Sequence, residues 1–213
     1  MTAPAVLSIA RVHGPPLARD FYARPVVELA RALLGCVLVS QAKDGLTAGR
    51  IVEAEAYAGP DDRASHARAG LTARTAPMFG PPGHAYVYLV YGMHECLNIV
   101  GEVDGRAGAV LLRALEPLAG VELMRRRRSR PTDPASRLAA GPARLAQALG
   151  VTRADNGHDL TLGRRLWLAA PEAPPDPTAI ASGPRIGVGY AGAEWSARPW
   201  RLWLRDSAAV SRR

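Results

Sequence analysis

The chain has 213 residues, 48% of them hydrophobic, which is enough to bury a core and favours one domain over two. A formal net charge of +8 and a pI near 10.3 indicate a polyanionic partner, most simply nucleic acid. No run of about 18 apolar residues occurs, which excludes a membrane-spanning helix. Two cysteines without a CxxC pair, and no secretory signal, predict a reducing, cytoplasmic setting.

The first 16 residues are rich in proline and glycine and show no sustained apolar period. We therefore expect a flexible N-terminal arm over 1–16, a single folded domain over 17–205 and a short basic tail over 206–213. Apolar residues at helical spacing predict a helix over Asp20–Leu34.

Two β-type runs follow the helix, Cys36–Gln41 and Gly49–Tyr57, joined by the turn Lys43–Gly45. This turn places Lys43, the only lysine of the chain, at an exposed tip. Arginine therefore supplies nearly all of the positive charge.

Three further strands are predicted at Ala85–Tyr91, Cys96–Val100 and Ala109–Leu115, with Asp104-Gly105 as the turn between the last two. Because the connections are short, the pattern favours an antiparallel meander over βαβ units.

The remaining elements are a helix at Glu116–Arg128, a loop at Pro131–Ala139, a helix at Gly141–Gly150, an irregular stretch at Pro171–Pro184 and closing strands at Arg185–Tyr190 and Trp200–Leu204. The arginine run Arg125–Arg128 is typical of a solvated helix face, and in a basic chain it is also a candidate phosphate anchor.

One strand-borne carboxylate has the setting of a general base. The period of two in Ile51–Tyr57 places Glu53, Glu55 and Tyr57 on one face, and the small apolar residues between them on the other. A carboxylate on a rigid strand next to a tyrosine suits proton abstraction beside a bound substrate. The alternative is that this face is simply solvated.

The tyrosines of the next strand divide in the same way. Tyr86 and Tyr88 share a face, and Tyr91 points away from them at the strand end. Tyrosine rings stack on nucleic-acid bases. The alternative is packing within the sheet, which we favour for Tyr86.

Two polar residues interrupt apolar strands, Asn98 and Arg113. Buried polar groups need partners. We expect both side chains to reach a cavity shared with Glu55, where Arg113 fixes the carboxylate or its water.

Metal and cofactor motifs are missing from the sequence. The five histidines show no HExxH, HxxxH or Cys/His spacing, and the glycines form no phosphate loop. We expect no metal and no cofactor.

Seven ordered segments give the chain a resemblance to a known family. They are RIVEAEAY, SHARAG, MFGPPGHAYVYLVYGM, CLNIV, VLLRALEP, GPARLAQALG and RIGVGYAG, which lie between Arg50 and Gly192 within a likeness that covers roughly 17–204. The chain resembles the alkyladenine (3-methyladenine) DNA glycosylases. The resemblance implies a single α+β domain with a mostly antiparallel curved sheet, a protruding β-hairpin and surrounding helices.

The resemblance also implies a reaction, in which a damaged purine is rotated out of duplex DNA and its N-glycosidic bond is hydrolysed. It gives Glu55 the role of general base and Arg113 that of holding the water. The resemblance further implies that Tyr57, His66, Tyr88 and Asn98 form a pocket for the base. It implies that Tyr91, Met93 and His94 form a wedge in the minor groove. The position of His94 is commonly aromatic in relatives.

The expected partner is double-stranded DNA with damaged purines, bound by a monomer associated with a bacterial-type nucleoid. A glycosylase that also cuts the strand usually needs an amine, and Lys43 lies on an exposed turn, so we predict hydrolysis without lyase activity. The alternatives are a non-catalytic binder of damaged or single-stranded DNA, and a formyltransferase-like or other RNA-binding module that only the charge supports.

Overall fold

The computed structural model describes residues 14–103 and 105–212. Most of the predicted arm, and Asp104 of the predicted turn, lie outside these residues. The described chain contains one eight-stranded antiparallel sheet, with the order β3-β4-β5-β2-β1-β6 and with β8 pairing with both β2 and β7. The strands are β1 (Val37–Ala42), β2 (Gly45–Tyr57), β3 (Ala85–Val90), β4 (His94–Val100), β5 (Ala109–Ala119), β6 (Leu166–Ala169), β7 (Ile180–Gly183) and β8 (Arg201–Leu204).

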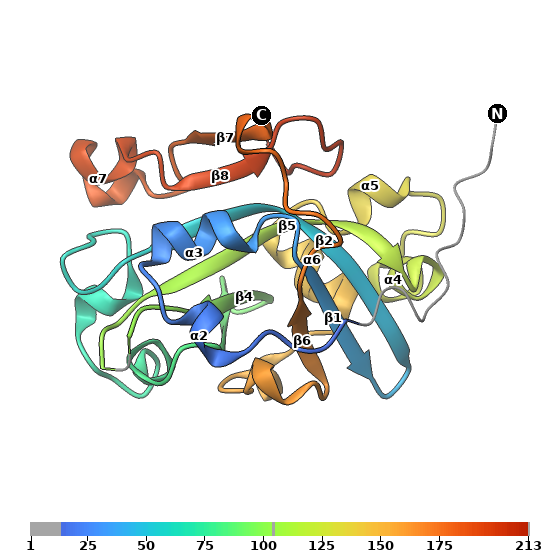
Figure 1. The fold of residues 1–213 in the computed structure, drawn as a ribbon, viewed down its shortest axis with the longest axis horizontal. Coiled ribbons are helices and arrows are strands. Elements are labelled where there is room, and N and C mark those ends of the chain that lie inside the picture. The colour runs from blue at the N-terminus through green and yellow to red at the C-terminus, as the bar shows by residue number, and fades with distance from the viewer. Residues whose placement is uncertain (1–13, 104, 213) are drawn as a thin grey trace.

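Short helices surround this sheet, so the predicted α+β class with a curled antiparallel sheet is confirmed (Figure 1). The α-helices are α2 (Arg19–Tyr22), α3 (Val26–Leu33), α4 (Val121–Arg128), α5 (Ala135–Leu138), α6 (Pro142–Leu149) and α7 (Ala193–Ala197). The 3-10 turns are η1 (His66–Ala69), η2 (Ala76–Phe79), η3 (Arg153–Asp155), η4 (Leu160–Leu162), η5 (Pro177–Ala179) and η6 (Gly189–Ala191). No helix of the described residues has the length and apolar character needed to cross a bilayer.

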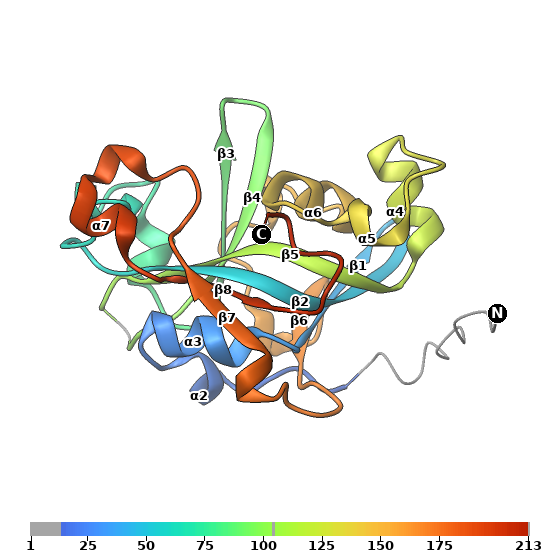
Figure 2. The same cartoon turned by 90° about the horizontal axis from the view of Figure 1, so that it is seen from above.

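The β3–β4 hairpin projects from the body of the molecule, as Figure 2 shows, between the α7 region and α6. Helices α3 and α6 lie on opposite sides of the sheet in the same view. Their apolar residues, including Leu29, Leu33, Leu145 and Leu149, belong to one large buried core. The hairpin is thus carried on a rigid support.

Two predicted helices are shorter than expected. The predicted Asp20–Leu34 helix is split into α2 and α3, because Pro25 lacks the N–H that a continuous helix would require. The predicted Glu116–Arg128 helix begins only at Val121. Its first residues instead extend β5, where Glu116 pairs with Arg50 of β2, and Gly120 makes the turn with a φ of 72°.

The C-terminal third differs most from the prediction. Arg185–Tyr190 is a turn followed by η6 rather than a strand, whereas the stretch expected to be irregular contains η5 and β7. Strand β6 was not predicted, and α5 lies in the predicted loop Pro131–Ala139. The described residues of the predicted tail pack on the domain, with Ala209 in the main core.

Strand β2 organises the site because it has neighbours along both edges. One edge pairs with β5, and the other pairs first with β1 and then, at Glu53–Glu55, with β8. Helix α3 also packs on β2. Glu53 and Glu55 are fully buried because the segments that contain Ile186 and Ser211 cover their face of the strand, so the alternative of a solvated strand face is wrong.

Candidate active site

Glu55 lies at the centre of the candidate active site with no exposed surface. Its Oε2 accepts hydrogen bonds from the Tyr57 hydroxyl at 2.8 Å and from Arg113 Nη1 at 3.2 Å. Its Oε1 accepts one from the backbone N–H of Ile186 at 2.7 Å. The shared strand face of Glu55 and Tyr57, and the contact of Arg113 with the carboxylate, agree with the expectation from the sequence.

Arg113 joins Glu55 to a second buried carboxylate. Its Nε donates to Glu53 Oε1 at 3.1 Å, while Nη1 contacts Glu55. Burial opposes the charge of Arg113, but Glu55 and Glu53 outweigh that effect and raise its pKa. The guanidinium is therefore a permanent cation clamped between two carboxylates.

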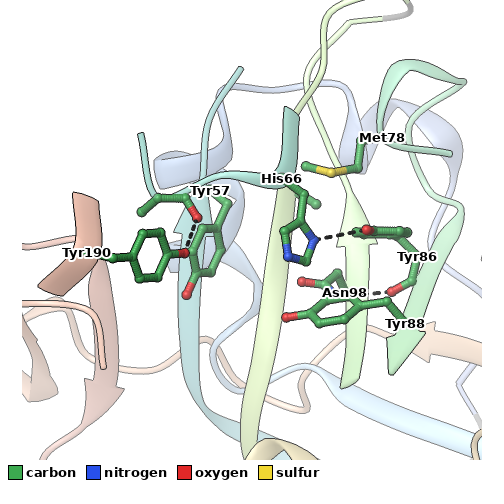
Figure 3. Close-up of a pocket in the computed structure, with 9 residues that line it drawn as sticks. Tyr57, His66, Met78, Tyr86, Tyr88, Asn98 and Tyr190 are labelled. Atoms are coloured by element: carbon green, nitrogen blue, oxygen red, sulfur yellow. Dashed lines mark hydrogen bonds between the residues drawn. The ribbon is translucent and has the colours of Figure 1, made fainter. Parts of the chain in front are cut away.

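A small pocket with aromatic walls lies beside this cluster (Figure 3). We call it the tyrosine pocket, and its lining residues are Tyr57, Ala64, His66, Met78, Tyr86, Tyr88, Asn98, Ala109 and Tyr190. In Figure 3 Tyr57 and Tyr190 stand on one side, with His66 and Tyr88 facing them. The predicted pocket residues are therefore brought together.

The rings on the β3 side form one packed group. The ring centroids of His66 and Tyr88 are 4.6 Å apart, and those of Tyr86 and Tyr88 are 5.4 Å apart. Burial raises the pKa of the Tyr88 hydroxyl, and burial together with Glu55 raises that of Tyr57. Both phenols therefore stay protonated, and Tyr57 acts as a hydrogen-bond donor.

The hydrogen-bond partners of His66 define its tautomer. Arg74 Nη2 lies 3.4 Å from Nε2, and because a guanidinium only donates, Nε2 is the acceptor. Nδ1 therefore carries the proton and donates to the Tyr86 hydroxyl at 3.0 Å. Tyr86 is thus more than the sheet packing that we favoured from the sequence, since it also holds His66 in place.

We expect His66 to make the protein less stable in mild acid. Burial, and then the charge of Arg74, lower its pKa from 6.5 to about 4. Between these values the unfolded chain binds a proton that the folded chain does not, so stability falls as pH drops from 6.5 towards 4. Urea unfolding at pH 7 and pH 5 should show a smaller loss for His66→Gln than for the wild type, and equal losses would contradict this account.

The hairpin tip presents the three predicted wedge residues to solvent. Tyr91 is 90% exposed, Met93 is 68% exposed and His94 is exposed. Tyr91 has a φ of 53°, which is uncommon for a bulky residue, and Gly92 follows with a φ of 70°. Tyr91 is therefore a turn residue beyond the end of β3, and it does not line the tyrosine pocket.

A cleft of about 540 Å³ connects the tyrosine pocket with the hairpin. Its lining includes Tyr57 and Tyr88 of the pocket, Tyr91 and His94 of the hairpin, and Arg113 above Glu55. Asn98 lies in the pocket, where its Nδ2 donates to the Tyr86 carbonyl at 3.0 Å. Asn98 and Arg113 therefore line adjoining hollows rather than one common cavity. Met93 lines a separate groove with Lys43 and Arg127.

A buried ion pair that local sequence patterns did not single out holds the loop behind Tyr57. Arg185 and Asp62 have fully buried side chains and form two hydrogen bonds, at 2.6 and 2.9 Å. The Arg185 guanidinium also lies 4.8 Å from the Tyr57 ring centroid and 5.0 Å from that of Trp200. This pair fixes the loop that supplies the Ile186 N–H and Tyr190.

The arginines of α4 mostly contact other side chains of the same protein. Arg125 contacts Glu122, Arg127 contacts Asp44, and Arg128 Nη1 donates to Gln147. Arg126 is the exposed member. Only part of the arginine run is therefore available as the candidate phosphate anchor. Among residues 14–103 and 105–212, no group of three His, Cys, Asp or Glu side chains has the arrangement of a metal site.

Comparison with known proteins gives the same family along nearly the whole chain. The model of the methylpurine-DNA glycosylase family matches residues 20–208. A protein of Methanocella arvoryzae, provisionally named a 3-methyladenine DNA glycosylase, is 50% identical over 93% of this chain and 97% of its own length. One of Anaeromyxobacter dehalogenans with the same provisional name is 52% identical over 92% and 85%. The human DNA-3-methyladenine glycosylase is 44% identical over 93% of this chain and 69% of its own length. The chain belongs to the methylpurine-DNA glycosylase family, whose reaction is the hydrolysis of an N-glycosyl bond in DNA.

Proposed function

We propose that the protein removes alkylated purines from duplex DNA by turning the damaged nucleotide into the tyrosine pocket and hydrolysing its glycosidic bond. The observation that carries this proposal is the setting of Glu55 beside an aromatic pocket. A carboxylate has about four acceptor positions, and Tyr57, Arg113 and Ile186 occupy three of them. The remaining position on Oε1 is available to a water molecule that Glu55 can deprotonate.

The pocket has the chemistry of a base-binding site. Tyr57, His66 and Tyr88 offer ring faces for stacking, which contributes about 1–3 kcal/mol per base. A cationic alkylpurine gains a further attraction to tyrosine rings. Asn98 lies at the pocket wall, where it selects against the exocyclic amino group of guanine.

The hairpin supplies a group for the space that the flipped nucleotide leaves. Tyr91 is the exposed aromatic residue at the tip, and Met93 and His94 flank it. Inserted side chains of this kind support an unstacked step, and extrusion costs least for damaged or mispaired bases. Lesions are therefore favoured before any pocket contact forms.

We expect wild-type protein to release base from a duplex with one damaged purine and to leave an intact abasic strand. The lone Lys43 is exposed at the β1–β2 turn and does not line the tyrosine pocket, so no lysine amine is placed to attack the sugar. Base release from duplexes with 3-methyladenine, 7-methylguanine, hypoxanthine or ethenoadenine, followed by alkali cleavage, measures both points. Strand cleavage without alkali, or a borohydride-trapped complex, would disprove the hydrolytic mode, and no release from any duplex would disprove the function.

A further inference from the structure

Glu53 is a second carboxylate of β2, and the proposed function gives it no role. It is fully buried, and of its hydrogen-bond partners only Arg113 lines the cleft, whereas all three partners of Glu55 line it. A buried charge without partners is strongly destabilising.

Three donors hold the Glu53 carboxylate. Oε1 accepts from Arg113 Nε and from Arg201 Nη1, each at 3.1 Å, and Oε2 accepts from the backbone N–H of Ser211 at 2.7 Å. Arg113 and Arg201 come from β5 and β8, the two strands that flank β2. Ser211 comes from the segment that follows β8. The carboxylate thus joins the C-terminal segment to the sheet.

Through Arg113, the position of Glu53 affects Glu55. A guanidinium is planar and rigid, so a contact that fixes Nε also fixes the direction of Nη1. Nη1 is the atom that meets Glu55 Oε2 at 3.2 Å. Without Glu53, Arg113 would keep one carboxylate partner and could rotate about it.

Arg201 connects the same carboxylate to the loop on the other side of Glu55. Its Nε donates to the Pro184 carbonyl at 3.1 Å, and its Nη1 also donates to the Arg212 carbonyl at 2.9 Å. Its guanidinium stacks on Trp203, 4.2 Å from the ring centroid. Pro184 lies two residues before Ile186, whose N–H contacts Glu55 Oε1. Two of the three donors to Glu55 are therefore linked to Glu53.

We infer that Glu53 is a positioning residue for hydrolysis, and that the Ser211 N–H and Arg201 hold it so that Arg113 and Ile186 present Glu55 correctly to water. The C-terminal segment is then part of the catalytic support although it is remote from the cleft. This inference rests on the proposed role of Glu55 as the base.

Ser211 offers a substitution with a matched control. Ser211→Pro removes the N–H that Glu53 Oε2 accepts, whereas Ser211→Ala keeps it. The Ser211 hydroxyl is buried and has no hydrogen-bond partner among the described residues, so its removal should leave activity and stability unchanged or slightly improved. Any difference between the two variants therefore reports on the backbone donor.

The experiment measures single-turnover base release and duplex binding, using the panel lesion that the wild type releases fastest. We expect Ser211→Pro to release base about tenfold more slowly, the scale of one lost hydrogen bond to a charged group, with the Kd for the duplex unchanged within about twofold. Ser211→Ala should match the wild type. In a Glu53→Gln background the effect of Ser211→Pro should shrink, because the carboxylate through which it acts is gone.

Equal rates for Ser211→Pro and Ser211→Ala would overturn the inference, as would a loss in which rate, DNA affinity and melting temperature fall together. If Ser211→Pro does not fold, Glu53→Gln alone carries the test, with slower release at unchanged Kd expected. Glu55→Gln, run in parallel, separates the two ideas. An inactive Glu55→Gln with an unaffected Ser211→Pro refutes only the role of Glu53. A Glu55→Gln variant that releases base at the wild-type rate refutes the role of Glu55 as base, on which the inference rests, whereas no release by the wild type refutes the proposed function itself.

Discussion

Glu55→Gln should reduce base release by about 10²- to 10⁴-fold, the usual contribution of a general base, while leaving binding to a lesion duplex nearly unchanged. Glutamine has the size of glutamate, and its Oε1 can still accept from Tyr57 or Arg113. Its amide cannot take a proton from water at neutral pH. Single-turnover release and duplex titration on the same preparation measure the two effects.

Glu116→Gln is a suitable control, because Glu116 pairs with Arg50 on the same sheet and its side chain is 41% exposed. It removes one negative charge without touching the cleft, and its release rate should equal that of the wild type. Release by Glu55→Gln at a wild-type rate would show that another group activates the water. Loss of duplex binding together with release would instead make Glu55 a structural residue.

Asp62→Ala should have the largest effect on stability, about 3–5 kcal/mol in the free energy of unfolding, because it leaves a fully buried guanidinium unpaired. Asp62 also accepts the backbone N–H groups of Ala58 and Ala64, at 3.1 and 3.0 Å. Urea unfolding at neutral pH gives this difference directly. We also expect slower base release from the folded fraction, because the loop of Ile186 loses its anchor.

Glu194→Ala provides the comparison for Asp62→Ala. It breaks an ion pair with Arg198 in which the Glu194 side chain is 73% exposed, and it should cost no more than about 1 kcal/mol. If the two substitutions cost the same, burial would not be what gives the Asp62–Arg185 pair its importance.

Local sequence periodicity was sufficient for the part of the site that lies on β2. The period of two placed Glu55 and Tyr57 together, because side chains alternate in any strand. It does not apply to Tyr91, which lies in the turn after β3 and lines the same cleft as Tyr88. It could not show that Glu53 and Glu55 are buried. That depends on the segments that cover this face of β2, which contain Ile186 and Ser211 and come more than 130 residues later in the chain.

The residues that sequence reasoning missed reach the site from distant loops. The segment predicted to be a strand contains Arg185, Ile186 and Tyr190. Each contributes to the site through a hydrogen bond to a residue more than 120 positions earlier: Arg185 to Asp62, Ile186 to Glu55 and Tyr190 to Ala64. RIGVGYAG belonged to the ordered segments of the resemblance, which was the one available signal that this loop mattered. Similarly, Glu116 and Pro117 look like a helix start, but pairing with β2 keeps them in a strand.

The three donors to Glu55 also set the order in which the enzyme can become competent during its own synthesis. Tyr57 follows Glu55 immediately, Arg113 emerges from the ribosome later, and the N–H of Ile186 comes 131 residues after the carboxylate. A nascent chain can pair β2 with β5 before the last donor exists. The role proposed for Glu55 therefore needs the segment that contains Ile186, so a chain that already pairs β2 with β5 still lacks one of the three donors.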